Sequence, residues 1–173
     1  MNRVIQRTRK QNRLDGHDYS KAGYYFITIC AGQRAELFGC VGRDDLGAPC
    51  VKLSQYGQIV QKYISSIPSA YHNIRVDKYV IMPNHVHLIL WVTTSESGAP
   101  GSSRPTQLIP RLIAAIKRFS NRDAGFNMWQ KSYHDHIIRN KADYRRIWEY
   151  IDTNPEKWQE DCYYEDRERG LSP

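Results

Sequence analysis

Long apolar runs are missing from this chain, as are paired cysteine motifs, a glycine-rich phosphate loop and internal repeats. Hydrophobic residues make up 40% of 173 positions, and no stretch approaches the length of a bilayer, so no membrane span is expected. The N-terminus is basic but no apolar segment follows it, which argues against a secretory signal and predicts a cytoplasmic protein. The cysteines lie too far apart for a zinc motif and indicate reduced thiols: Cys30, Cys40, Cys50 and Cys162.

Charge is distributed unevenly along the chain. The formal net charge is +7, which makes an anionic polymer such as nucleic acid a plausible partner. The length fits one domain, over 19–158, between a basic arm at 1–18 and an acidic tail at 159–173. The arm either contacts phosphates or merely solubilises the chain, and its cations are Arg3, Arg7, Arg9, Lys10 and Arg13. The tail, with Asp161 among its acids, is expected to be solvated; competition with nucleic acid for a basic face is the alternative.

The residue pattern predicts an α+β fold, a ferredoxin-like βαββαβ antiparallel sheet with an inserted hairpin and a C-terminal helix. Aromatic and β-branched residues predict the strands, and apolar residues at helical spacing predict the helices. The expected strands are Tyr24 to Cys30, Ile74 to Met82, His85 to Val92 and Trp129 to Ile138, with hairpin arms at Leu37 to Val41 and Cys50 to Leu53. The expected helices run from a cap at Ser54 to Pro68, along a stripe from Leu108 to Phe119, and from a cap at Asn140.

The third helix is predicted to place functional side chains beside its core stripe, which comprises Tyr144, Ile147, Trp148 and Ile151. On a helical wheel Tyr150 and Asn154 fall at the edge of that stripe, where a side chain is held firmly and still reaches a cleft. Residues four apart share a helix face, so the amide oxygen of Asn154 could complete a metal shell beside the phenol of Tyr150. A partly buried tyrosine and a polar residue that ends the helix before Pro155 are the plain alternatives.

Two histidines one residue apart, His85 and His87, lie in the apolar run from Tyr79 to Val92. In a strand both imidazoles leave the same face and can hold one cation, while the intervening residues pack behind. With Tyr150 and Asn154, the pair predicts a metal site facing a tyrosine nucleophile.

Two other histidine patterns compete with this pair. His134 and His136 repeat the spacing, but their flanks are less apolar, so they could instead lie at a strand end, contact phosphate or fix neighbouring side chains. Histidine-triad nucleotide hydrolases also have alternating histidines after a strand. Their pattern needs a third alternating histidine, but this chain has Ile89 at that place. The sequence therefore does not support a histidine nucleophile.

Three segments in order, Tyr79 to Ile89, Trp129 to Arg139 and Tyr150 to Trp158, resemble the single-tyrosine HUH transposases (IS200-like). The strongest likeness is to the transposases associated with repetitive extragenic palindromes (REPs), and it spans roughly Tyr19 to Trp158. The resemblance implies metal ligands at His85, His87 and Asn154 and a nucleophile at Tyr150. The replication relaxases share the two histidines, but the match downstream of His87 favours the transposases.

The implied activity is cleavage and joining of single-stranded DNA beside a hairpin or palindrome. Tyr150 would attack a phosphodiester to give a 5′-phosphotyrosine and a free 3′-hydroxyl, and strand transfer would follow. The expected cofactor is Mg²⁺ or Mn²⁺, which acts as a Lewis acid on the scissile phosphate. The alternatives are a non-catalytic nucleic-acid-binding regulator and a metal-dependent phosphodiesterase that uses water. Related transposases can act as homodimers or monomers, and the sequence leaves both open.

A basic surface is expected to follow the DNA backbone, and one or more aromatic rings to stack on an unpaired base. These side chains, together with the arm, form the predicted DNA-binding set: Lys117, Arg118, Trp129, Tyr133, His136, Arg139, Arg145 and Arg146.

Overall fold

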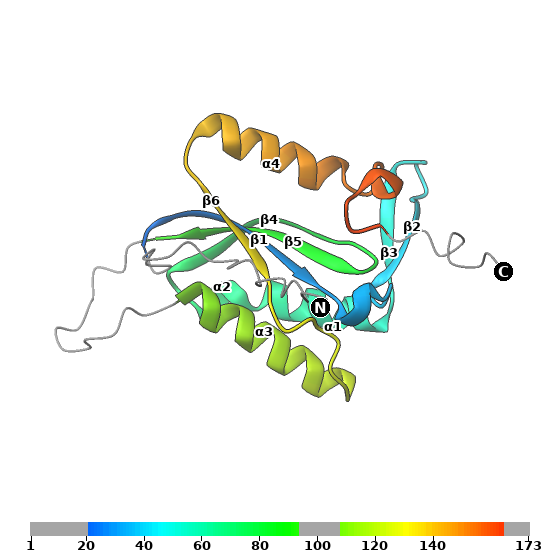
Figure 1. The fold of residues 1–173 in the computed structure, drawn as a ribbon, viewed down its shortest axis with the longest axis horizontal. Coiled ribbons are helices and arrows are strands. Elements are labelled where there is room, and N and C mark those ends of the chain that lie inside the picture. The colour runs from blue at the N-terminus through cyan, green and yellow to red at the C-terminus, as the bar shows by residue number, and fades with distance from the viewer. Residues whose placement is uncertain (1–20, 94–107, 165–173) are drawn as a thin grey trace, which may run out of the picture.

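The computed structural model describes residues 21–93 and 108–164. Within them one four-stranded antiparallel sheet has the order β4-β5-β1-β6, and a separate two-stranded hairpin stands at one end (Figure 1). The sheet strands are β1 (Gly23–Cys30), β4 (Ile74–Ile81), β5 (His85–Val92) and β6 (His134–Ile138), and the hairpin strands are β2 (Gly39–Arg43) and β3 (Pro49–Leu53).

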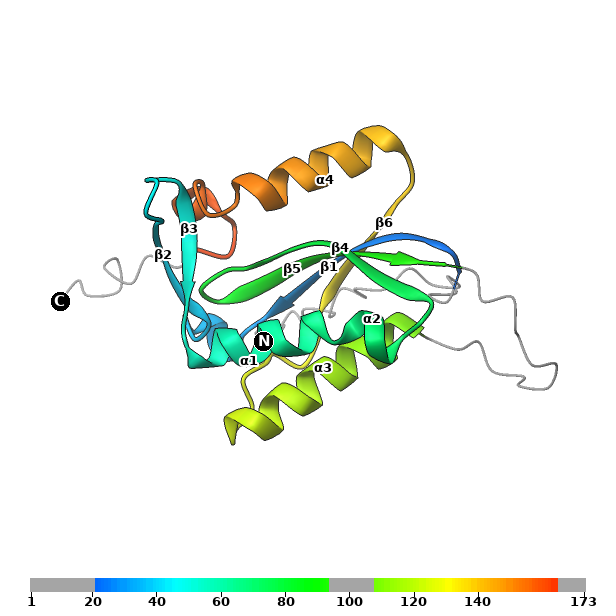
Figure 2. The same cartoon turned by 180° about the vertical axis from the view of Figure 1, so that it is seen from behind.

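Helices cover both faces of the sheet (Figures 1 and 2). One face carries α1 (Gln55–Ser65), α2 (Ile67–Ala70) and α3 (Leu108–Ala124), and the other carries α4 (Lys141–Thr153) alone. Along the chain β1, α1, β4, β5, α3 and β6 follow in βαββαβ order, so the predicted fold class is confirmed. None of the helices in the described ranges is long and apolar enough to cross a bilayer.

Strand β5 lies inside the sheet and faces a different environment on each side. Val86, Leu88, Leu90 and Val92 point into the main core beneath α1 and α3. Ile89 points the other way, into a smaller cluster with Ile138, Ile147 and Ile151 under α4. Because side chains alternate along a strand, His85 and His87 share the α4 face with Ile89.

Local capping explains where two helices begin. The Ser54 side chain accepts from Gly57 N at the start of α1, and the Asn140 side chain accepts from Asp143 N at the start of α4. Both caps were predicted. The first helix ends earlier than expected, at Ser65, because Pro68 lies in the first turn of the separate helix α2.

The last sheet strand was predicted too long. It begins at His134, and Trp129 makes only an isolated bridge to Ala31. The Lys117 ammonium donates to the carbonyls of Gln130 (2.7 Å) and Ser132 (2.9 Å), which turns these acceptors away from a strand ladder.

The predicted core stripe of α4 is half correct. Ile147 and Ile151 are buried and Tyr144 is partly buried, but Trp148 is 38% exposed. Its ring lies 4.1 Å from the Lys78 ammonium at the β4 edge of the sheet, so Trp148 covers a cation and not the core.

Candidate active site and metal centre

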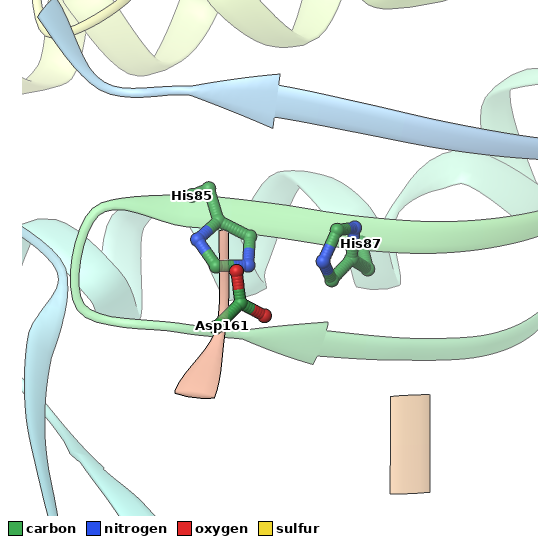
Figure 3. A group of neighbouring side chains, drawn as sticks. All are labelled: His85, His87 and Asp161. Carbon is green, nitrogen blue, oxygen red and sulfur yellow. The ribbon is translucent and has the colours of Figure 1, made fainter. Parts of the chain in front are cut away.

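Two imidazoles leave the same face of β5 and meet a carboxylate from the C-terminal segment (Figure 3). His85 and His87 are buried, and Asp161 follows the short helix η2 (Trp158–Glu160). One atom from each of the three residues lies within 4.8 Å of the others. Two imidazoles and a carboxylate form a donor set that suits a divalent cation.

The His85 ring is oriented by Asn84 in the β4–β5 turn. Asn84 Nδ2 donates to the carbonyl of Tyr163 (2.8 Å), so its Oδ1 is the atom that accepts from His85 Nδ1 (2.8 Å). The proton of His85 therefore lies on Nδ1, and the lone pair of Nε2 is free to bind a cation.

The His87 ring is held between two hydroxyls. Its Nδ1 lies 2.8 Å from Thr28 Oγ1, and its Nε2 lies 3.2 Å from the Tyr150 hydroxyl. A threonine hydroxyl can donate or accept, so Thr28 supports either tautomer of His87, including the one that leaves Nε2 free for a metal.

Two buried polar atoms support the metal hypothesis directly. In the described part of the chain, His85 Nε2 and Asn154 Oδ1 have no hydrogen-bond partner. Leaving a buried acceptor unpaired costs about 1–3 kcal/mol, and a cation bound between such atoms would satisfy both. The residues therefore fit a bound divalent metal.

Both histidines are kept neutral in the metal-free site. Burial lowers the pKa of His85 to about 4, although the nearby Asp161 carboxylate opposes the shift. Burial, and then the charge of His85, lower the pKa of His87 well below its usual value. Neutral imidazoles are the form that binds metals, so the site is ready for a cation at neutral pH.

The Tyr150 hydroxyl lies against this cluster. It donates to Asp161 Oδ2 (2.9 Å), and the same oxygen accepts from Asn154 Nδ2. Burial, followed by the Asp161 charge, raises the pKa of Tyr150 far above its usual value. The phenol is therefore protonated in this arrangement, and a neighbouring positive charge is needed to make it a better nucleophile.

Asp161 joins the predicted ligands, and the ligand role of Asn154 stays a prediction. The structure groups Asp161 with the two histidines, while Asn154 lies beside them and donates to Asp161. Asn154 is the C-cap of α4 and is 2% exposed. Its side-chain amide bonds to Asp161, so the amide group lies at the site.

Asp161 and Tyr163 were missed because the sequence places them in a segment predicted to be a solvated tail. The Tyr163 ring packs 4.6 Å from the His85 ring, and its backbone N–H donates to Asp161 Oδ1 (2.8 Å). The signal that could have identified this segment is its aromatic content, because Tyr163 and Tyr164 are unusual in a solvated tail.

The rival histidine pair lies elsewhere. His134 and His136 are exposed on β6. His136 Nε2 bonds to Asp143 Oδ2 (2.7 Å), and Arg146 pairs with the other oxygen of that carboxylate, Oδ1. Across 21–93 and 108–164, the group of possible metal ligands comprises His85, His87 and Asp161.

The predicted DNA-binding side chains fall into three groups. Trp129 and Tyr133 are core residues, so neither ring is placed to stack on a base, and Lys117 is engaged by backbone carbonyls. The exposed cations on or near α4 are Arg139, Arg145 and Arg146, whereas Arg118 is exposed on α3, across the sheet. The basic arm, with Arg3, Arg7, Arg9, Lys10 and Arg13, lies outside the described residues.

Several known proteins are similar to this chain in sequence. No protein-family model matches the chain. An uncharacterised Haemophilus influenzae protein is 32% identical, and the alignment covers 91% of this chain and 94% of that protein. The REP-associated tyrosine transposase of Escherichia coli K12 is 32% identical over 57% of this chain and 59% of its own length. The chain is similar to REP-associated tyrosine transposases.

A solved structure of such a transposase bound to a REP hairpin has the same fold. Its TM-score is 0.58 at 23% identity, and the match covers 91% of this chain and 86% of that one. The resemblance drawn from the sequence is confirmed, since relatives and a structural neighbour are named as transposases of this kind.

Proposed function

We propose that this protein is a metal-dependent transposase of single-stranded DNA, with Tyr150 as its nucleophile. The observation that carries the proposal is the meeting of a phenol with a cation site. The Tyr150 hydroxyl lies 3.2 Å from His87 Nε2 and 2.9 Å from Asp161 Oδ2, inside the cluster that fits a divalent metal.

The residues that would hold Mg²⁺ or Mn²⁺ are His85 and His87, with oxygens from Asp161 and Asn154. A bound cation would supply Lewis-acid stabilisation of charge on the scissile phosphate. Oxygen ligands suit either metal, and two imidazoles suit Mn²⁺ better. Because one chain supplies all of these residues together with Tyr150, a homodimer is not required to complete the site.

The proposed reaction is a balanced exchange of esters. Tyr150 Oη forms a bond to phosphorus and the bond to the 3′ oxygen breaks, which leaves a 5′-phosphotyrosine and a 3′-hydroxyl. The phenol proton leaves towards Asp161, its hydrogen-bond acceptor, and the departing 3′ oxygen gains a proton. A second 3′-hydroxyl can reverse the step and join strands.

DNA with a hairpin is the proposed substrate, because the relatives are named for repetitive palindromes and one was solved with a REP hairpin. The test incubates purified protein with end-labelled single-stranded hairpins from its genomic neighbourhood, with Mn²⁺ or with chelator. We expect a metal-dependent covalent band on a denaturing gel that is lost in Tyr150→Phe and in His85→Ala.

Other outcomes of this gel decide between the alternative functions. Cleavage that persists in Tyr150→Phe would indicate a phosphodiesterase that uses water. Hairpin binding without any cleavage would indicate a binding regulator.

A further inference from the structure

A hollow lies on the α4 side of the sheet, at the N-terminal end of that helix. It has a volume of about 370 Å³, at the lower end of the range of about 300–1,000 Å³ typical of small-ligand sites. Its lining combines aromatic and basic side chains from β1, the end of β6 and the start of α4: Tyr24, Ile138, Arg139, Asn140, Lys141 and Tyr144.

The aromatic wall of this hollow is fixed in place. The Tyr24 and Tyr144 rings meet edge to face, with centroids 5.3 Å apart, and Tyr24 stacks on Trp91 at 5.9 Å. Tyr144 also donates its hydroxyl to Asp77, which orients the ring. Trp91 is 36% exposed, so the ring cluster is accessible from solvent. A nucleobase can stack on such rings whatever its sequence.

The basic wall carries two cations that have no ion-pair partner among the described residues. Arg139 and Lys141 are exposed, and neither forms an ion pair with another residue of the described ranges. The adjacent acid, Asp143, is already paired with His136 and Arg146. Two free cations beside a ring cluster fit a phosphate next to a base.

Strand β1 connects the hollow to the nucleophile. The side chains of Tyr24, Phe26 and Thr28 lie on the same face of β1, because they are two residues apart, and successive ones are about 7 Å apart. Tyr24 lines the hollow, the Phe26 ring lies 5.1 Å from His87 and 6.2 Å from Tyr150, and Thr28 bonds to His87. Tyr144 and Tyr150 are six residues apart on α4, which corresponds to a rise of about 9 Å along the helix. Two to three stacked nucleotides, at about 3.4 Å each, would span that distance.

We propose that this hollow binds one unpaired nucleotide of single-stranded DNA, with its base against Tyr24 and Tyr144 and its phosphate at Arg139 and Lys141. The hollow would hold the strand two to three nucleotides from the bond that Tyr150 attacks. This inference rests on the proposed function and adds a subsite to it. It also transfers the stacking role predicted for Trp129 and Tyr133, which are buried, to rings that solvent can reach.

The test separates binding from catalysis by using the Tyr150→Phe protein. The probe is a short oligothymidylate containing 5-bromodeoxyuridine, which is cross-linked by ultraviolet light and mapped by mass spectrometry. We expect cross-links at Tyr24, Tyr144 or Trp91. Tyr24→Leu should weaken binding of the probe by about fivefold or more, whereas Tyr56→Leu, a matched change on α1, should not.

A second pair of variants tests the basic wall without disturbing packing. Arg139→Ala with Lys141→Ala should lower the slope of log affinity against log salt by about 0.7 for each lost phosphate contact. Lys52→Ala with Arg111→Ala removes two exposed cations from the hairpin and α3, and should leave the slope unchanged. Thermal unfolding checks that each variant is folded.

The outcomes distinguish this inference from the proposed function. Cross-links elsewhere, equal effects of the two double variants, or no binding of the probe would overturn the nucleotide site. In each case the covalent band formed with hairpin DNA still decides the catalytic proposal. Conversely, cross-links in the hollow without any covalent band would support the nucleotide site and reject catalysis.

Discussion

The two faces of the sheet use the same strands for different purposes. The face beneath α1 and α3 is filled by a continuous apolar core that includes Leu88 and Leu90. The face beneath α4 has a small apolar cluster, and beside it lie His85, His87 and the Tyr150 hydroxyl. The candidate site thus rests on an apolar core to which its own side chains do not belong. A substitution that harms one face should therefore leave the other face intact.

The sharpest way to test this separation is to remove a histidine from the α4 face. His87→Ala should weaken Mn²⁺ binding by more than about 100-fold and abolish the covalent band, because it deletes a ligand and not only a supporting residue. Calorimetric titration of the metal measures the loss. Thr28→Val, which removes only the bond that orients His87, should cost about tenfold. Equal Mn²⁺ affinity in wild type and His87→Ala would reject the assigned site.

The opposite change is Leu88→Ala on the α1 and α3 face. Leu88 is fully buried, so the truncation should lower the free energy of unfolding by about 2–5 kcal/mol. Urea denaturation measures this. The folded variant should bind Mn²⁺ as wild type does, and a large loss of metal affinity would show that the two faces are coupled.

Acid should act mainly through the α4 face of the metal-free protein. Burial lowers the pKa of His85 to about 4 and also lowers that of His87, so between pH 6.5 and 4 the unfolded chain binds more protons than the folded one. The free energy of unfolding should therefore fall as the pH drops through this window, by up to about 1.4 kcal/mol per unit for each histidine.

Urea midpoints at pH 7 and pH 5 provide the measurement. The difference should shrink in His87→Ala and persist in His72→Gln, which removes an exposed imidazole. An unchanged difference in His87→Ala would mean that other groups control the acid response.

The smallest effect is expected at the outer edge of α4. Trp148 lies over Lys78 and is 38% exposed, so Trp148→Ala should lower the free energy of unfolding by about 0.5–1 kcal/mol and leave metal binding intact. Ile151→Ala, three residues along the same helix but buried, is the matched comparison and should cost several times more. Similar losses in the two variants would place Trp148 in the core after all.

The sequence predicted what depends on local periodicity. The alternation of β5 placed His85 and His87 on one face, and the cap at Asn140 gave the start of α4. What it could not predict depends on contacts between distant segments. Lys117 shortens β6 by bonding to two carbonyls, and Asp161 reaches the site only because the chain turns back after α4. Neither contact leaves a periodic pattern.

The alternation of β5 also limits how the gene for this protein can change. Loss or gain of one codon within His85–Val92 would exchange the two sets of side chains beyond that point; at Val86 it would carry His87 under α3 and aliphatic groups towards Tyr150. Loss of two codons would preserve the faces and shorten the strand. Surviving lineages should therefore vary in this segment by substitution and, where its length changes, by pairs of residues.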